Sequence, residues 1–324
     1  MPTVLITGGT GLIGKNLTRH LTAKGYNVII VSRKPQKVSD NKMITYAKWN
    51  IDQQEVDVDA ISRTDYIINL AGAGVMDKKW TTKYKQEILE SRTKSSELLI
   101  TALKENPNNV KAVISASAIG WYGEDAVTNP PPTPAAKSSI EKDTYKFVEI
   151  DNADKSFLGE TCRLWEKSME PITQLDKRLV KLRTGIALSN EGGAYAEFKK
   201  PLRFGIAGIL GSGKQVISWI HMDDLCRMYI YAIENEKLSG SYNAVAPFPV
   251  DNKNLILKMA NLVRGQFYIP AYLPKFLLKI ILGEKSIEIL KSTTVSCEKI
   301  KAAGFTFLYP SIDAALKELT VLKN

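Results

Sequence analysis

The first fourteen residues place the tightest limit on what this chain can fold into. Val4, Leu5 and Ile6 form a short apolar run of the kind found in buried central strands. A Thr-Gly-Gly-Thr break follows, and residues 12–21 then carry apolar side chains at helical spacing. A strand, a glycine turn and a helix start therefore open the chain, which predicts an α/β fold built on a Rossmann-type doubly wound parallel sheet.

The glycine turn predicts a dinucleotide site. A tight turn needs residues without a Cβ penalty, a pyrophosphate needs close access to bare backbone, and the helix must pack closely on its strand. The helix N-terminus then offers unpaired N–H groups and a partial positive charge to the anion. The strand before the turn and the helix after it favour this interpretation over an ordinary structural turn. The residues expected at the cofactor are Gly8, Gly9, Thr10, Gly11, Leu12, Ile13 and Gly14.

The end of the second predicted strand, residues 27–31, indicates which dinucleotide is bound. Proteins that prefer NAD usually have an acidic residue about twenty residues past the glycine turn, where it binds the ribose 2′-OH. This chain has Ser32, Arg33 and Lys34 there. A hydroxyl and two cations suit the 2′-phosphate of NADP, because charge-assisted hydrogen bonds to phosphate are strong. NADP is therefore predicted, with a solvated basic loop as the alternative.

Composition excludes several other classes of protein. The chain has 324 residues, of which 44% are hydrophobic and 24% charged, the balance of a soluble globular protein with one or two domains. The net charge of +10 comes from scattered cations without a nucleic-acid motif, so no nucleic-acid partner is expected. Three distant cysteines and two histidines indicate neither a disulfide framework nor a metal site. No apolar run approaches the roughly 18 residues of a membrane span, and no signal peptide is recognised, so a cytoplasmic protein without a membrane partner is expected.

Two later strands lead toward the same predicted site. Residues 65–73 read as the fourth strand of the sheet, running into small residues at Leu70, Ala71 and Gly72 where backbone can approach a cofactor. Residues 78–104 follow helical spacing and carry Arg92, for which a surface position and a cofactor contact are both open. Residues 110–117 form the next strand and lead into Ala118 to Gly123.

Taken together, TGGTGLIG, INLAGAG and SASAIGWYG resemble an extended or atypical short-chain dehydrogenase/reductase. The later segments LRTGIAL, GILGSGKQ, SWIHMDDL and YNAVAP, with the C-terminal LPKFLLKIILGE and AAGFTF, are similar to one subgroup of that superfamily. This subgroup consists of the epimerase family proteins of the NAD-dependent epimerase/dehydratase family, which have a C-terminal module of their own. The resemblance covers nearly the whole chain.

The resemblance implies a set of cofactor contacts. It places Gly8 to Gly14 on the pyrophosphate, Ser32 and Arg33 on the 2′-phosphate, and Leu70 and Ala71 beside the ribose. It also implies that Glu87 and Arg92, on the helix facing that site, touch the cofactor.

The usual catalytic pair of the superfamily is missing. Such reductases pair a tyrosine with a lysine four residues later, and the lysine lowers the phenol pKa from its ordinary value of about 10. Counting from Glu166, the two positions fall near Leu158 and Cys162, which have neither chemistry. Tyr195 and Lys199 have the same spacing but follow a later strand, and we interpret that match as chance.

The remaining catalytic candidates are Ser117 and Tyr122. Ser117 stands where a substrate-polarising serine is expected, with a small strand-end residue as the alternative. Tyr122 is the nearest aromatic acid, although such a tyrosine more often lines a substrate pocket. Glu160 and Cys162 are outside candidates for proton transfer, and His221 is interpreted as a packed, hydrogen-bonded histidine.

The predicted domains are a Rossmann domain of residues 1–184 plus 216–245 and a smaller, mainly helical substrate or lid domain of residues 185–215 plus 246–324. A proline-rich insertion within residues 128–154 is a flap or a disordered bulge. In residues 273–291, core packing is favoured over a basic amphipathic helix that binds a membrane or partner helix.

The predicted function is an NADP-dependent oxidoreductase or epimerase-like enzyme. Its small-molecule substrate would be a carbonyl or hydroxyl compound, with a sugar nucleotide as one candidate, and homodimerisation is open. The alternative is a catalytically silent NADP-binding sensor or assembly protein.

Overall fold

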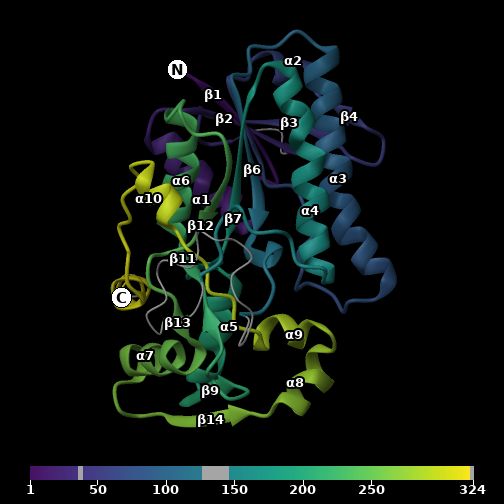
Figure 1. Cartoon of the computed structure of the whole chain (residues 1–324). Coiled ribbons are helices and arrows are strands. Elements are labelled where there is room, and N and C mark those ends of the chain that lie inside the picture. Colours follow the sequence, from purple (N-terminus) through teal and green to yellow (C-terminus); the bar gives the residue numbers. More distant parts are fainter. Residues whose placement is uncertain (36–38, 126–145, 322–324) are drawn as a thin grey trace. The chain divides into compact units, whose positions relative to one another are not determined.

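The computed structural model describes residues 1–35, 39–125 and 146–321 (Figure 1). The proline-rich stretch at 130–134 lies outside the described residues. The chain divides into two compact units, and each is considered by itself. Unit 1 comprises residues 1–118, 160–183 and 222–242, and unit 2 comprises residues 119–159, 184–221 and 243–324. The described parts of residues 119–159 group with unit 2, and the domain boundaries expected from the sequence stay a prediction.

Unit 1 is built on an eight-stranded sheet. Its strands are β1 (Thr3–Thr7), β2 (Asn27–Ser32), β3 (Ile44–Asn50), β4 (Glu55–Val56), β5 (Tyr66–Asn69), β6 (Ala112–Ala118), β7 (Arg178–Thr184) and β12 (Gly240–Ala244), in the order β12-β7-β6-β5-β1-β2-β3-β4. The strands from β3 through β2, β1 and β5 to β6 pair in parallel, and β4 is antiparallel to β3. The strand order reverses at β1, so the predicted doubly wound parallel sheet is confirmed.

Helices cover both faces of this sheet. Figure 1 shows α1 (Leu12–Ala23) and α6 (Met222–Glu234) on one face, and α2 (Val58–Ser62), α3 (Thr82–Glu105) and α4 (Phe157–Met169) on the other. Strand residues such as Leu5, Ile67 and Val113 are fully buried against Leu99 of α3. Because both faces are covered, the central strands are continuous apolar runs, as the sequence predicted. Short 3-10 turns, η1 (Ile119–Trp121) and η3 (Glu170–Leu175), follow β6 and α4.

Unit 2 is assembled from short strand pairs and helices. The pairs are β8 (Ile186–Leu188) with β11 (Trp219–His221), β9 (Ile206–Leu210) with β14 (Ile269–Leu273), and β10 (Val216–Ile217) with β13 (Val250–Asp251). The helices are α5 (Gly193–Leu202), α7 (Asn252–Arg264), α8 (Lys275–Leu282), α9 (Lys285–Leu290), α10 (Glu298–Ala302) and α11 (Ile312–Val321). Its core contains Tyr195, Ile209, Trp219, Met259 and Leu316, which come from five different elements.

The sequence-based prediction of core packing for residues 273–291 is wrong for α8. Leu278 is the buried residue of this helix, while Phe276, Leu277, Ile280 and Ile281 are exposed. Aliphatic residues at helical spacing require an apolar partner, but the spacing does not say whether that partner belongs to the same chain. Within the described residues, no helix combines the length and the apolar character that crossing a membrane requires.

Candidate cofactor site and the replaced catalytic pair

The turn after β1 is shaped so that only glycine fits at two positions. Gly8 has φ +67°, and a Cβ there would lie 2.8 Å from the Leu70 carbonyl oxygen. A Cβ on Gly14 would lie 2.5 Å from the Cα atom of Gly9. Both distances are to backbone, which cannot move aside, so α1 and the turn after β5 lie in direct backbone contact with this turn.

Thr7 fastens the turn after β5 to the end of β1. Its Oγ1 donates a hydrogen bond to Asn69 Oδ1 at 2.6 Å and accepts from the amides of Leu70 and Ala71, each at 3.1 Å. The two turns therefore meet at the carboxyl ends of neighbouring parallel strands, where the strand order reverses. Open α/β sheets bind their ligands at this point.

The first turn of α1 presents backbone amides. Gly11 is the N-cap residue, with φ −76°, and no side chain caps the helix. Thr10 and Gly11 are exposed. The amides of Leu12, Ile13 and Gly14 come before the first intrahelical hydrogen bond, from the Lys15 amide to the Gly11 carbonyl. An anion is the natural partner for such amides, and the glycine turn leaves no side chain to block it.

The end of β2 carries the predicted 2′-phosphate residues. Ser32 is half-buried at the last position of the strand, and Arg33 and Lys34 are exposed immediately after it. No carboxylate occurs between Ser32 and Pro35. This chemistry fits a phosphate and offers no carboxylate acceptor for a ribose hydroxyl.

Arg92 braces the turn after β5 from α3. Its Nη1 donates to the carbonyls of Ala73 and Ile88, at 3.1 and 2.8 Å, and its guanidinium lies 4.9 Å from the centre of the Trp165 ring. Burial lowers the pKa of Arg92 from its ordinary value, although an arginine remains charged. The side chain is half-buried, and the guanidinium nitrogens Nη2 and Nε make no hydrogen bond to the described residues.

Glu87, five residues earlier on α3, is exposed and forms an ion pair with Lys78 at 3.1 Å. The cofactor contacts of Glu87 and Arg92 stay predictions.

A buried carboxylate holds together three neighbouring strands of unit 1. Glu166 of α4 accepts two hydrogen bonds from Arg183 of β7, from Nε at 2.8 Å and from Nη2 at 3.0 Å. Ser117 of β6 donates to the same carboxylate at 2.7 Å, and Ser241 of β12 donates at 3.0 Å. Lys181 lies 3.8 Å away and also pairs with Glu170. The four hydrogen bonds occupy both carboxylate oxygens.

This network keeps the side chain of Glu166 deprotonated. Burial acts to raise its pKa, but the hydrogen bonds and charge of Arg183, helped by Ser117 and Lys181, hold the pKa below its ordinary value. Glu166 is therefore a permanent carboxylate near neutral pH, and its oxygens are already used. It serves as a structural anchor rather than a free base.

Ser117 donates its only hydroxyl hydrogen to this carboxylate. Its oxygen can still accept a hydrogen bond, so toward a substrate it suits a hydroxyl donor better than a carbonyl acceptor. From the sequence alone, Glu166 was only the reference position for locating the usual tyrosine and lysine, and no role was predicted for Arg183. The one available signal was the presence of two cations, Lys181 and Arg183, in a strand that is otherwise apolar at 179, 180 and 182, since a charge buried in a sheet needs a partner.

Leu158 and Cys162, the positions where the resemblance predicts the usual tyrosine and lysine, lie on α4, one helical turn apart. Leu158 is apolar, and Cys162 is buried beside Arg92 and Glu166. Burial raises the pKa of the Cys162 thiol to about 12. The thiol is therefore neutral at physiological pH and cannot replace a lysine cation. Glu160 is exposed and paired with Arg163.

Tyr122 lies in unit 2, just after η1, and is fully buried. Its hydroxyl donates to Asn243 Oδ1 at 2.7 Å, and its ring stacks on Phe147 at 5.2 Å. To act on a substrate, Tyr122 would have to give up the bond to Asn243. The catalytic assignments of Ser117 and Tyr122 stay predictions.

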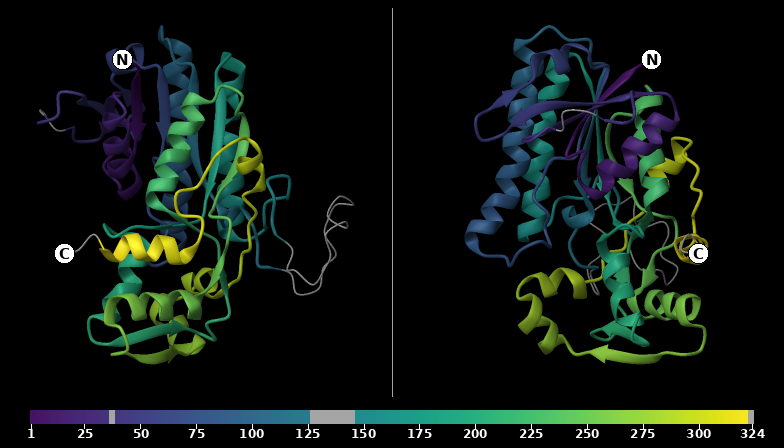
Figure 2. Two further views of the ribbon diagram at one scale, coloured as in Figure 1. Left: turned by 90° about the vertical axis from the view of Figure 1, so that its left-hand side faces the viewer. Right: turned by 180° about the vertical axis from the view of Figure 1, so that it is seen from behind.

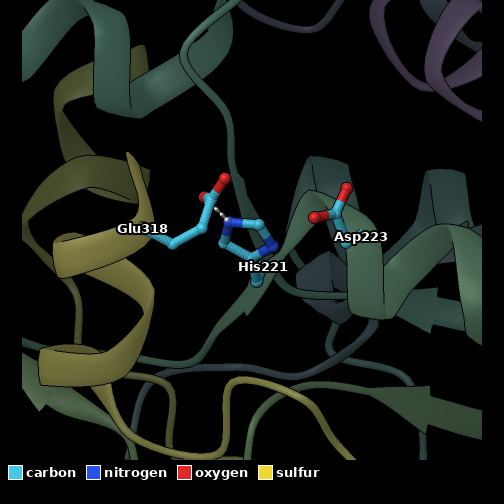
Figure 3. Close-up of side chains that lie close together, drawn as sticks. All are labelled: His221, Asp223 and Glu318. Atoms are coloured by element: carbon cyan, nitrogen blue, oxygen red, sulfur yellow. Dashed lines mark hydrogen bonds and ion pairs between the residues drawn. The ribbon is translucent and has the colours of Figure 1, made fainter. Parts of the chain in front are cut away.

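The remaining aromatic and histidine candidates are packed within unit 2. Tyr195 of α5 is fully buried, with the Lys199 ammonium 5.6 Å from the centre of its ring. His221 is buried, and Figure 3 shows its Nε2 hydrogen-bonded to Glu318 of α11, at 2.8 Å. Its ring also lies 4.0 Å from that of Tyr309. Asp223, drawn in the same figure, belongs to unit 1, where it pairs with His20 at 3.1 Å.

Comparisons with known proteins agree with this geometry. The model of the NAD dependent epimerase/dehydratase family matches residues 4–149, and a domain of unknown function, DUF1731, matches residues 273–319. Epimerase family protein SAR0825 of Staphylococcus aureus is 35% identical over 320 residues, covering 98% of this chain and 99% of the relative. Epimerase family protein YfhF of Bacillus subtilis is 36% identical over 320 residues, covering 98% of this chain and 97% of the relative.

Two solved structures share the fold and are 27% and 29% identical in sequence to this chain. Human epimerase family protein SDR39U1, solved with NADPH, superposes with a TM-score of 0.82 at 27% identity and covers 98% of this chain and 99% of that one. A nucleoside-diphosphate sugar epimerase from Corynebacterium glutamicum has a TM-score of 0.73 at 29% identity and covers 99% of this chain and 59% of that one. The resemblance predicted from the sequence motifs is confirmed: this chain belongs to the NAD dependent epimerase/dehydratase family, among the epimerase family proteins with a C-terminal DUF1731 domain.

Proposed function

We propose that this chain binds NADPH in unit 1 and acts as an NADPH-dependent oxidoreductase or epimerase-like enzyme. The observation that carries the proposal is the glycine turn, in which a Cβ at Gly8 or Gly14 would collide with backbone. A purely structural turn does not require the glycine turn, the start of α1 and the turn after β5 to approach one another so closely. A pyrophosphate site does require it. The NADPH in the human relative supports the choice of cofactor.

Each part of the site has a defined task in this proposal. The amides at the start of α1 bind the pyrophosphate, and Ser32, Arg33 and Lys34 bind the 2′-phosphate. Arg92 holds the turn at Ala73 in place beside the ribose. NADPH, when bound, would supply a hydride to a carbonyl carbon of the substrate, and Ser117 would orient the substrate by accepting a hydrogen bond from a hydroxyl group beside that carbonyl. The relative from Corynebacterium supports a sugar-nucleotide-like substrate.

The 2′-phosphate assignment predicts a reversal of cofactor preference in Arg33→Glu. Reversing this charge removes one or two charge-assisted hydrogen bonds and adds repulsion, so NADPH affinity should fall about 30-fold or more. NADH lacks the 2′-phosphate, and its affinity should change little or rise. Calorimetric titration of both nucleotides into the wild type and the variant measures this.

Arg63→Glu is the matched control, because Arg63 is also exposed on unit 1 but lies after α2. It should leave both affinities unchanged. Equal loss of NADPH affinity in the two variants would contradict a local phosphate contact, and equal wild-type affinity for NADPH and NADH would remove the NADP assignment.

A catalytically silent NADPH-binding protein is the second candidate. Two observations favour it: the hydrogen of Ser117 is committed to Glu166, and the Cys162 thiol stays protonated. In a working tyrosine–lysine pair, by contrast, the phenol can release its proton to the substrate and the lysine carries a positive charge.

Ser117→Ala separates the two candidates. If the chain is an enzyme, the variant should lose turnover with a panel of carbonyl compounds, measured as NADPH oxidation, while NADPH affinity stays within about twofold. Ser117→Thr keeps the hydroxyl and should restore activity. Absence of turnover in the wild type, with tight NADPH binding, would favour the silent protein.

A further inference from the structure

Unit 2 carries an exposed apolar surface that the cofactor site does not explain. It is formed by β9, β14 and α8, and we call it the apolar tip. Phe204, Phe267, Ile269, Phe276 and Ile280 are its most exposed large side chains, at 67% to 87% of their full accessible surface. Monomeric soluble proteins rarely expose large groups of neighbouring apolar side chains, and such groups often mark a binding surface.

The exposed apolar side chains of the tip are carried by adjoining elements. Ile206 of β9 and Ile269 of β14 are directly opposite in the parallel pair, and both are exposed. The end of β9 then meets the start of α8, where a Cβ on Gly211 would lie 3.5 Å from the side chain of Lys275. Figures 1 and 2 show β14 running straight into α8 beside β9.

Helix α8 is amphipathic with its apolar face outward. Its exposed apolar residues form two pairs spaced by one helical turn, Phe276 with Ile280 and Leu277 with Ile281. Leu278, on the opposite side of the helix, is buried. Lys275 and Lys279 are spaced by one turn along the same helix and are exposed. Neither forms an ion pair with any residue in the described part of the chain.

The charge of the two segments that build the tip has a single sign. Residues 198–222 and 252–283, which include the tip and its flanks, together contain nine lysines or arginines and no aspartate or glutamate, and the exposed Glu284 follows directly after α8 and Gly283. Lys258 pairs with Asp313 and Lys200 with Glu197, but Arg203, Lys275 and Lys279 are exposed cations close to the apolar side chains. Apolar and aromatic side chains bordered by cations match a surface that is apolar inside and anionic outside.

We propose that the apolar tip binds the surface of an anionic lipid bilayer. Phe204, Phe267, Phe276 and Ile280 would enter the boundary between headgroups and acyl chains, and Lys275 and Lys279 would contact lipid phosphates. A second copy of the chain fits less well, because a symmetric dimer through this surface would bring Arg203, Lys275 and Lys279 of both copies together, and residues 198–222 and 252–283 offer no carboxylate to pair with them. The proposal departs from the expectation that the chain has no membrane partner, which assumed that α8 packs in a core.

Flotation with lipid vesicles tests the proposal on the full chain. The wild type should float with vesicles of phosphatidylcholine and phosphatidylserine, bind those of phosphatidylcholine alone far more weakly, and release as salt is raised. Phe276→Ser with Ile280→Ser should remove binding. Lys275→Gln with Lys279→Gln should weaken the partition coefficient roughly thirtyfold, at about 1 kcal/mol for each lysine.

Phe248→Ser is the matched control, since Phe248 is exposed in the loop between β12 and β13, outside the tip. It should float like the wild type. All tip substitutions are at exposed positions, so the circular dichroism spectrum and melting temperature should not change. The proposal is overturned if the wild type does not bind anionic vesicles, and a change of oligomeric state in the tip variants would not rescue it. It is also overturned if the tip variants and the control variant bind the vesicles equally.

Discussion

Gly14→Val is expected to abolish NADPH binding and to destabilise the protein. Even the first carbon of a side chain at this position would lie 2.5 Å from Gly9 Cα and 2.6 Å from the Gly8 carbonyl oxygen, so α1 would have to move away from the turn. Overpacking against backbone should cost at least about 3 kcal/mol of unfolding free energy. Loss of two or more amide–phosphate hydrogen bonds should weaken NADPH at least about 100-fold. Calorimetric titration and thermal melting measure the two effects.

Gly11→Ala distinguishes a cofactor site from a structural turn. Gly11 has an ordinary φ of −76°, and a Cβ there would meet only the Gly8 carbonyl oxygen, at 3.3 Å. Stability should therefore change by less than about 1 kcal/mol. NADPH affinity should fall, because the new methyl group would occupy space at the exposed start of α1 where the pyrophosphate is expected. A variant that binds NADPH as the wild type does would mean that this turn has no close ligand.

Glu166→Gln is expected to have the largest effect on stability among conservative substitutions in unit 1. It leaves Arg183, which is 3% exposed, without a counter-charge, and it turns an amide toward the donors of Arg183 or Ser241. Breaking one side of a buried ion pair costs about 3–5 kcal/mol. Denaturant unfolding followed by circular dichroism measures it.

Glu160→Gln is the control for that variant. Glu160 lies on the same helix and also pairs with an arginine, Arg163, but both side chains are exposed. Exposed pairs contribute little, so the melting temperature should hardly move. A similar loss in both variants would show that the effect comes from α4 itself rather than from the buried network.

The same pair predicts a dependence on pH. The folded pKa of Glu166 lies below the ordinary glutamate value of about 4.3, so the folded state binds that proton more weakly than the unfolded state. The stabilisation is fully present above about pH 4.3 and is lost as the pH falls through the folded pKa. The stability difference between the wild type and Glu166→Gln should therefore shrink in acid. A difference that stays constant down to pH 3 would contradict this assignment.

Much of unit 1 follows from local patterns in the sequence. Val4 to Ile6, residues 27–31 and residues 110–117 were predicted as buried strands, and they are found as β1, β2 and β6. Continuous apolar runs bounded by turn residues leave few alternatives in a parallel sheet that is covered on both faces. Gly8 and Gly14 were equally predictable, because close backbone approach and a positive φ both select glycine.

The partners of the buried polar groups could not be predicted in this way. Glu166 and Arg183 are separated by sixteen other residues and lie on a helix and a strand, and nothing local to either indicates that they meet. Ser117 was expected to face a substrate, but its hydrogen bond goes to Glu166. Whether a hydroxyl donates to a carboxylate or to a ligand depends on what the neighbouring strands place beside it.

The sequence by itself determined the doubly wound sheet and the glycine turn with its phosphate-compatible surroundings, while the absence of the tyrosine–lysine pair was inferred from the family resemblance. The sheet and the turn depend on residue type and short-range spacing. Only the tertiary structure decided that Cys162 is a buried neutral thiol, that Tyr122 donates to Asn243, and that α8 turns Phe276 and Ile280 outward. Burial and hydrogen-bond partners come from segments far apart in the chain, and the same amphipathic spacing serves a core or an exposed surface equally well.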